Sequence, residues 1–248
     1  MPQTGAAQGT GGLGLETQVA AAVLAGGASR RMGRDKATLP LDRAGGAALG
    51  RLVLAAAARV ADPVVLVAPV GHVAAALAGE AGVALVPDPG EGPLPALAAA
   101  LEAVDAPYLL LLAADHPGLR IALLQQLVTR AVQRGAPAVA CRVGPGGRAT
   151  QPRGPDPGTP GFGRPSGKPP MEHGLEPLVA VYRRGLALAA ARERLRGGPD
   201  RSLRGLLGSL HPDVLEEHEW RALDPDGSSF VDLDDPADLA AWQAGGKP

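Results

Sequence analysis

The chain has 248 residues, a length that fits one large α/β domain with a sizeable core. It carries 24 basic and 25 acidic residues, so no overall charge recruits nucleic acid or an anionic membrane, and neither is expected as a partner. Aromatic residues make up 2% of the chain and apolar residues 46%, so the core must be built mainly from Ala, Val and Leu.

Short apolar runs alternate with longer Ala- and Leu-rich segments in the first part of the chain. The short runs are typical of buried strands, and they lie at Val19–Leu24, 64–67, 83–86, 108–112 and 138–140. The longer segments predict helices at 47–59, 72–81, 94–104 and 119–134. This order predicts an α/β fold with a doubly wound, mostly parallel sheet, whose ligand-binding edge carries the loops after Leu24, Val86 and Leu112.

The composition changes between 144 and 170, where Gly and Pro dominate. We expect a flexible insertion there and a disordered Gly-rich extension over 1–18, so that 19–244 forms a single domain. Regular structure is expected again as strands at 178–182 and 230–233 and as helices at 185–195, 202–207 and 236–242. Asp235 is placed to cap the last helix, and Pro236 suits its first turn.

The single cysteine, Cys141, allows no internal disulfide and indicates a buried thiol in a reducing compartment. The five histidines show no metal-ligand spacing and no partnered Ser or Cys nucleophile. An apolar run near the N-terminus is too short to span a bilayer. These features predict a cytoplasmic protein without structural zinc.

The strongest local pattern runs from Leu24 to Lys36 and reads Leu-Ala-Gly-Gly-Ala-Ser-Arg-Arg-Met-Gly-Arg-Asp-Lys. Because Gly26 and Gly27 have no Cβ, backbone N–H groups at this strand end can converge on phosphate oxygens. Side chains that can neutralise a triphosphate follow at Arg30, Arg31 and Lys36. The alternative is an ordinary turn followed by a solvated basic stretch. The pattern is neither the dinucleotide-binding G-x-G-x-x-G motif nor the Walker A motif.

Two aspartates end other predicted strands. The carboxylate of Asp115 is a hard oxygen ligand that can hold Mg²⁺ against a phosphate, although a turn or helix-capping aspartate is the competing interpretation. Asp88 lies four residues before Gly92 and can accept hydrogen bonds from a base or ribose, and here too an ordinary turn aspartate is the alternative. Together with the glycine loop, these residues favour a nucleotide site.

The Leu24 to Lys36 pattern resembles the signature of the MobA-like nucleotidyltransferases, and it is most similar to the molybdenum cofactor guanylyltransferases within that family. Further segments resemble family motifs, namely Gly92-Pro93-Leu94, Leu112-Ala113-Ala114-Asp115-His116-Pro117, Glu176-Pro177-Leu178-Val179-Ala180-Val181-Tyr182, Arg201-Ser202-Leu203-Arg204 and Asp234-Asp235-Pro236-Ala237-Asp238-Leu239. The resemblance covers about 19–244 apart from the insertion, and it implies a Rossmann-like nucleotidyltransferase fold.

The resemblance implies an enzyme that moves GMP from GTP to the phosphate of a molybdopterin-type cofactor, with Mg²⁺ as its cofactor and pyrophosphate as product. It assigns catalysis to Lys36, Asp115 and Arg31, with Asp115 as the metal ligand. Together with the strand-end position of Asp88, it leads us to expect nucleotide binding at Leu24, Ala25, Gly26, Gly27, Arg30, Lys36, Asp88, Gly92, Asp115, Asp232 and Asp234. A general base is not needed, because a phosphate monoester is already largely dianionic at neutral pH.

The chain departs from the family pattern in two places. Pro95-Ala96 stands where Ala-Gly is expected, and Asp232 and Asp234 stand where asparagines are usual. The two carboxylates can supply a second metal contact or repel an acceptor phosphate. Two alternatives therefore stay open: a transferase that uses CTP or a sugar or small-molecule phosphate, and a catalytically silent nucleotide-binding protein that contacts cofactor-handling proteins.

Overall fold

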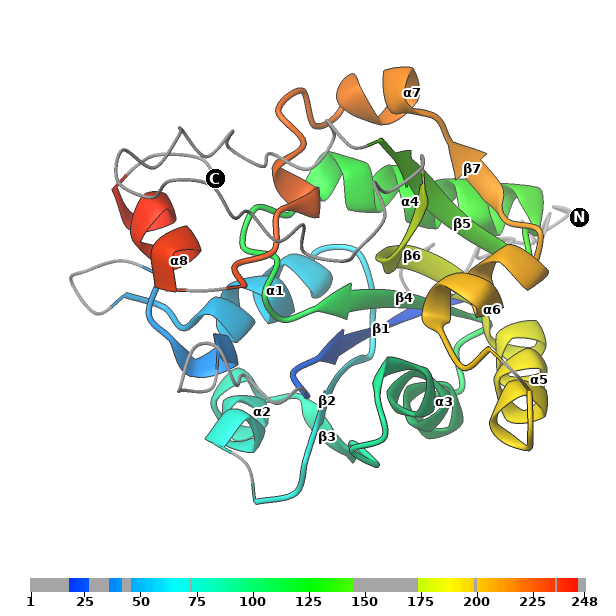
Figure 1. The fold of residues 1–248 in the computed structure, drawn as a ribbon, viewed down its shortest axis with the longest axis horizontal. Helices are drawn as coiled ribbons and strands as arrows, with labels where there is room; N and C mark the ends of the chain where they lie inside the picture. Colours follow the sequence, from blue (N-terminus) through cyan, green and yellow to red (C-terminus); the bar gives the residue numbers. More distant parts are fainter. Residues whose placement is uncertain are drawn as a thin grey trace, which may run out of the picture.

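The computed structural model describes residues 18–26, 36–41, 46–71, 73–144, 174–198, 200–234 and 236–244. The predictions for Gly27, Arg30, Arg31 and Asp235, and nearly all of the predicted extension and insertion, fall outside these ranges. Within them, seven strands form one sheet in the order β3-β2-β1-β4-β6-β5-β7 (Figure 1). The strands are β1 (Val19–Leu24), β2 (Val64–Ala68), β3 (Ala84–Pro87), β4 (Tyr108–Ala113), β5 (Ala138–Val143), β6 (Gly174–Arg183) and β7 (Asp213–Leu215).

The sheet is mostly parallel, as the strand-helix order predicts. The four strands β3, β2, β1 and β4 are parallel to one another, and β7 is parallel to β5. The exception is β6, which lies antiparallel between β4 and β5. The predicted α/β fold with a doubly wound sheet is confirmed, with one reversed strand.

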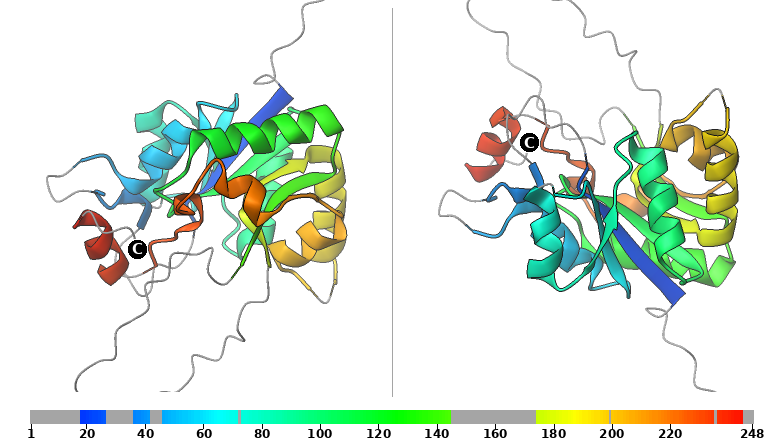
Figure 2. Two further views of the ribbon diagram at one scale, coloured as in Figure 1. Left: turned by 90° about the horizontal axis from the view of Figure 1, so that it is seen from above. Right: turned by 90° about the horizontal axis from the view of Figure 1, so that it is seen from below.

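Helices cover both faces of the sheet, which explains why its central strands are apolar on both sides. One layer contains α1 (Leu49–Ala57), α2 (Ala76–Ala81) and α4 (Ile121–Arg134). The other contains α3 (Pro93–Ala103), α5 (Arg184–Leu195) and α6 (Leu203–Ser209). Side chains alternate between the layers along β1, so that Val19, Ala21 and Val23 face the first and Ala20, Ala22 and Leu24 the second. Figure 2 shows α4 over one face and α3 over the other.

The predicted strand at 230–233 is wrong. Residues Ser228–Phe230 form a short 3-10 helix, η4, and 231–234 continue outside the sheet. The N–H groups of Phe230 and Val231 donate to the carbonyls of Gly227 and Ser228, and the N–H of Leu233 donates to the carbonyl of Asp115. Because these donors already have partners, the segment does not need a neighbouring strand.

Two short elements that the sequence pattern does not predict follow α6. They are β7 and α7 (Glu217–Arg221), and both are tied to α4 through one side chain. Arg130 donates to Asp213 at 2.9 Å and to Glu219 at 2.8 Å. The predicted helix at 72–81 is also divided, into the 3-10 helix η3 (Val73–Ala75) and α2.

The helix α8 (Pro236–Gln243) contains no fully buried residue. Its Leu239 and Trp242 side chains pack against a small buried cluster formed by Leu49, Val231 and Leu233. This contact holds the end of the described chain beside α1 (Figure 1). In the part of the chain that the structure describes, no helix has the length and apolar character needed to cross a membrane.

Candidate functional site

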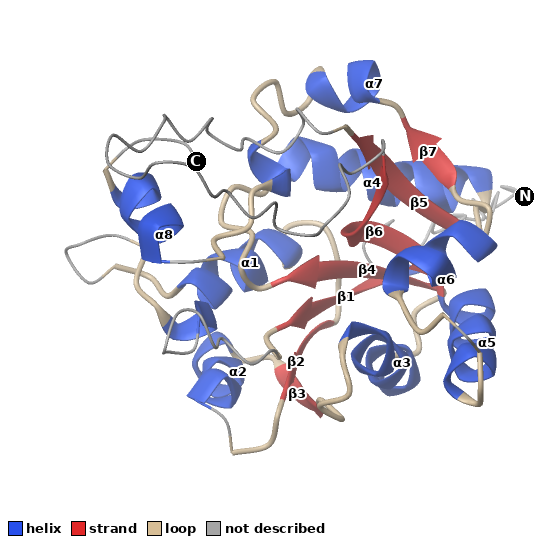
Figure 3. Ribbon diagram, in the orientation of Figure 1, coloured by secondary structure: helices blue, strands red, loops and turns tan. Residues whose placement is uncertain are grey.

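The carboxyl ends of β1 and β4 lie side by side, and their arrowheads point the same way in Figure 3. Leu24 is paired with Ala113, and the N–H of Ala114 donates to the carbonyl of Leu24 at 2.9 Å. The loops that contain Gly26 and Asp115 therefore start next to each other at one edge of the sheet. The parallel topology places ligand sites of α/β proteins at this edge.

Asp88 lies against the glycine loop. Ala25 donates its N–H to the carbonyl of Val67 at 2.8 Å, which holds the start of the loop beside β2. A Cβ added at Gly26 would collide with the Asp88 carboxylate, so this close approach requires a glycine. The Oδ1 atom of Asp88 accepts the N–H of Gly90 at 2.9 Å. Two segments predicted to contact a nucleotide are thus in direct contact with each other.

Lys36 brings together two of the predicted carboxylates. Its Nζ atom lies 2.8 Å from Oδ1 of Asp234 and 3.7 Å from Oδ2 of Asp115. The Lys36 side chain is 17% exposed and that of Asp115 28%, whereas Asp234 is 53% exposed. The ammonium therefore lies partly sheltered between two acidic groups that come from distant parts of the chain.

The segment that carries Asp232 and Asp234 is oriented by its apolar neighbours. Val231 is 5% exposed and Leu233 is fully buried, and both pack against Leu49. Alternate side chains of an extended chain point in opposite directions. Asp232 and Asp234 are therefore directed away from this cluster, Asp232 being half-buried and Asp234 exposed.

Gly92 precedes α3 and has a φ of 105°, which is in the region that favours glycine. Pro93 then occupies the first turn of the helix, where its missing N–H costs nothing. Glu91, just before Gly92, forms an ion pair with Arg201 at 3.2 Å. Arg201 belongs to one of the segments that resemble family motifs. The ion pair thus places this segment next to the turn at Gly92, which is predicted to contact the nucleotide.

A hydrogen-bonded connection between the Asp115 loop and η4 was missed in the sequence. The carbonyl of Ser229 accepts a hydrogen bond from Nδ1 of the buried His116 at 3.1 Å, and Leu233 donates to the carbonyl of Asp115 at 3.2 Å. The fully buried Asp224 also belongs to this connection, because its carboxylate accepts the N–H groups of Ser228 and Ser229. The only signal in the sequence is a pair of serines four residues after an aspartate, which is too common to predict a tertiary contact.

The carboxylates of Asp115 and Asp234 fit a divalent cation, because both already face one positively charged group. Among the described residues, no three or more His, Cys, Asp or Glu side chains form a group that could hold a metal ion alone. Two carboxylates suit Mg²⁺, which usually keeps water and substrate phosphates among its ligands. The roles assigned to Gly27, Arg30 and Arg31 stay predictions.

The molecule has a Rossmann-like nucleotidyltransferase fold, with the candidate site at the carboxyl edge of its parallel strands. Solved structures with the same fold include molybdopterin-guanine dinucleotide biosynthesis protein A from Archaeoglobus fulgidus, with a TM-score of 0.64 and 20% identity over 91% of this chain and 97% of that chain. They also include 2-C-methyl-D-erythritol 4-phosphate cytidylyltransferase from Thermus thermophilus, with a TM-score of 0.57 and 20% identity over 90% and 96%.

The family follows from the sequence itself. Residues 21–214 match the MobA-like NTP transferase domain, and the chain belongs to this family. A protein from Mycobacterium avium named "probable molybdenum cofactor guanylyltransferase" is 41% identical over 49% of this chain and 62% of its own length. One of the same name from Synechococcus elongatus is 44% identical over 43% and 55%. The matches thus span less than two thirds of these relatives.

Proposed function

We propose that the protein is a magnesium-dependent nucleotidyltransferase that moves GMP from GTP to the phosphate of a molybdopterin-type cofactor and releases pyrophosphate. The observation that carries this proposal is the meeting of Lys36, Asp115 and Asp234 at the sheet edge where Gly26 contacts Asp88. The names of the relatives support the choice of GTP and of the acceptor. The lone buried thiol of Cys141 supports a cytoplasmic location.

In this proposal, Asp115 and Asp234 would hold Mg²⁺, and the ion would supply positive charge to the triphosphate. The Lys36 ammonium moves from the carboxylates to a phosphate oxygen, where it offsets negative charge on the transferred group. Backbone groups at Ala25 and Gly26 approach the phosphates without a side chain in the way. Asp88, beside Gly26, accepts hydrogen bonds from the ribose or base.

The transfer exchanges one bond for another. An oxygen of the acceptor phosphate forms a bond to the α-phosphorus of GTP, and the bond from that phosphorus to the oxygen bridging to the β-phosphate breaks. The electron pair of the broken bond leaves with pyrophosphate. Since the acceptor oxygen already carries negative charge, the protein contributes alignment and charge stabilisation, with no proton to remove.

Pyrophosphate release over a panel of nucleotides and acceptors tests the proposal. With GTP and a molybdopterin-type acceptor we expect turnover that requires Mg²⁺. In Asp115→Ala this turnover should fall by at least about 100-fold, because the protein loses a carboxylate ligand of the metal ion that stabilises charge in the transition state. The control Asp213→Ala removes a carboxylate far from the site and should keep turnover. Turnover with CTP or with a sugar phosphate alone would contradict the assigned substrates, and GTP binding without turnover would contradict the enzymatic role.

A further inference from the structure

Asp224 is a fully buried carboxylate that the proposed chemistry does not use. Its Oδ2 atom accepts the N–H of Ser229 at 2.8 Å, and its Oδ1 atom accepts the N–H of Ser228 at 3.1 Å. The Nε atom of Arg120 lies 3.6 Å from Oδ1. A buried carboxylate is costly unless it is hydrogen-bonded and paired, and these three groups meet that requirement. The carboxylate thereby fixes the first two residues of η4.

The same two serines are bonded to the loop that follows Asp115. The Ser228 hydroxyl lies 2.8 Å from the carbonyl of Gly118, and the Ser229 hydroxyl accepts the N–H of Arg120 at 2.9 Å. The carbonyl of Ser229 is only an acceptor, so Nδ1 of His116 carries the proton in their 3.1 Å bond. A Cβ added at Gly118 would collide with the Ser228 carbonyl. The backbones of η4 and of the loop after Asp115 are therefore in direct contact.

This connection continues into the candidate site. Leu233 lies four residues after Ser229 and donates its N–H to the carbonyl of Asp115 at 3.2 Å. The next residue, Asp234, bonds to Lys36 at 2.8 Å. The Asp115 loop thus holds the segment at two points, Ser229 and Leu233, which leaves the Asp234 carboxylate little freedom relative to Asp115.

We propose that Asp224 is a positioning residue that holds residues 228–234 against the Asp115 loop, so that the carboxylates of Asp115 and Asp234 face the same cation. The proposal rests on the proposed function for the identity of that cation. Asp224 itself acts through Ser228 and Ser229 and does not touch the reacting groups. Residues that orient the ligands of a metal commonly change its affinity by roughly 10- to 100-fold.

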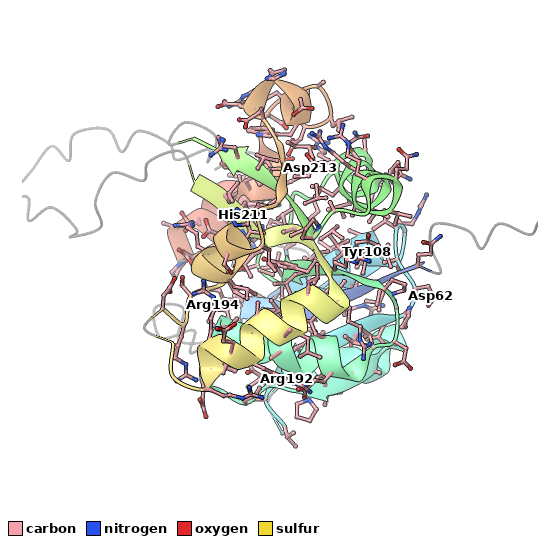
Figure 4. The ribbon with its side chains drawn as sticks, turned by 90° about the vertical axis from the view of Figure 1, so that its right-hand side faces the viewer. Asp62, Tyr108, Arg192, Arg194, His211 and Asp213 are labelled. Atoms are coloured by element: carbon pink, nitrogen blue, oxygen red, sulfur yellow. The ribbon has the colours of Figure 1, made fainter. Side chains whose placement is uncertain are left out.

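The test compares three variants of the full chain. Asp224→Asn replaces one acceptor oxygen by an amide donor and removes the buried charge. Ser228→Ala keeps that charge and removes the hydroxyl that bonds to Asp224 at 3.1 Å and to the carbonyl of Gly118 at 2.8 Å, which separates positioning from a loss of negative charge. Asp213→Asn removes a carboxylate at the opposite end of the sheet, where Tyr108 begins β4 and Asp213 begins β7 (Figure 4). This variant is the matched control.

Two readouts are measured without turnover. One is the hydrogen exchange rate of the Leu233 amide, which reports whether this amide stays bonded to Asp115. The other is the affinity for Mn²⁺ in the presence of GTP, followed by electron paramagnetic resonance and compared with the affinity for GTP in the absence of metal. A role limited to general stability would change metal-free GTP affinity and Mn²⁺ affinity together.

In Asp224→Asn we expect the Leu233 amide to exchange its hydrogen faster than in the wild type. We also expect this variant to bind Mn²⁺ roughly tenfold more weakly, while its affinity for GTP without metal stays unchanged. Ser228→Ala should show the same two effects at a smaller size, and Asp213→Asn should show neither. Unchanged Leu233 exchange in the folded variants would overturn the proposal. If Asp224→Asn does not fold, Ser228→Ala decides alone, because it removes a bond that Asp224 itself makes. A wild-type protein that binds no Mn²⁺ would contradict the proposed function, and Leu233 exchange would still decide the role of Asp224.

Discussion

Lys36 occupies the position between two carboxylates where the proposed function places a metal ion. In the free protein the Lys36 ammonium therefore offsets the negative charges of Asp115 and Asp234. In the proposed complex with metal and nucleotide, a divalent cation offsets the same charges. The two cations compete for Asp115 and Asp234, since like charges at short range repel. The metal and the nucleotide are then expected to bind together, because the triphosphate offers Lys36 another anionic partner.

Lys36→Met should separate these two effects. Without the competing ammonium, the nucleotide-free protein should bind Mn²⁺ more tightly by about 1 kcal/mol, or about fivefold, since the pairs are partly exposed. GTP should bind roughly tenfold more weakly, because a charged phosphate contact is lost. Titration with Mn²⁺ alone and then with GTP measures both.

Arg51→Met is the control for the Lys36 experiment. Arg51 forms an exposed ion pair with Glu80 at 3.5 Å on α1 and α2, and its loss should change neither affinity. A Lys36→Met protein that binds Mn²⁺ no better than wild type would show that the ammonium does not compete with the metal.

Gly26 should not tolerate a side chain while Asp88 is present. In Gly26→Ala the new methyl group and the Asp88 carboxylate must move apart, and we expect the melting temperature and GTP affinity to fall. The double variant with Asp88→Ala should regain most of the lost thermal stability. Gly79→Ala in α2, where a Cβ meets nothing within 4 Å, should be neutral or stabilising. Additive effects of the two substitutions would exclude the close contact.

At the scale of elements, Arg130 connects α4 to both β7 and α7. Burial alone would raise the pKa of Asp213, but hydrogen bonds and charges from Arg130 and then Arg134 outweigh it, so the pKa is lowered. The pKa of Glu219 is lowered first by the hydrogen bond from the Glu216 N–H and then by Arg130. Folding therefore favours the ionised form of both groups.

This sign fixes the pH dependence of the junction between α4, β7 and α7. A carboxylate whose pKa falls on folding stabilises the protein above its unfolded pKa, and this contribution is lost as the pH falls through the folded pKa. We expect Asp213→Asn to cost about 2 kcal/mol at pH 7 and progressively less below about pH 4. Thermal unfolding of both proteins from pH 7 to pH 3 measures the difference. A constant difference over this range would rule out the ionic contribution.

Elements were predictable where the apolar pattern was long and continuous. The residues of β1 agree with the prediction, and α4 differs from it only by a later start. The three residues of β7 and the five of α7 are too few to show a period, and their position depends on Arg130, which is 83 residues from Asp213. The segment after Phe230 has the composition of a strand, but the N–H groups of Leu233 and Asp234 donate to Asp115 and Asp238.

At the scale of the whole molecule, the edge position of Gly26, Asp88 and Asp115 was predictable, because parallel strands direct their following loops to one side. The meeting of Lys36 with Asp234 was not predictable without the family resemblance, since 198 residues separate them and no local pattern encodes that distance. The same holds for the contact of Ser229 with His116, which bridges 113 residues.

Ligand binding should stabilise the whole domain, because the predicted site joins loops from β1, β3 and β4 to the segment before α8. At a concentration 100 times its dissociation constant, a ligand adds about 2.7 kcal/mol to the free energy of unfolding. We expect GTP with Mg²⁺ to raise the melting temperature more than CTP, ATP or UTP with Mg²⁺. An equal rise with all four would indicate a site that recognises triphosphate and ignores the base.

The long separation of Lys36 from Asp234 also has a consequence for synthesis on the ribosome. Translation delivers β1, Lys36 and β4 well before Asp234, so a growing chain can assemble the first strands while one acidic partner is still untranslated. Until that partner emerges, the ammonium lacks its 2.8 Å contact with Asp234. Assembly of the pocket therefore has to wait until Asp234 has been translated, 198 residues after Lys36.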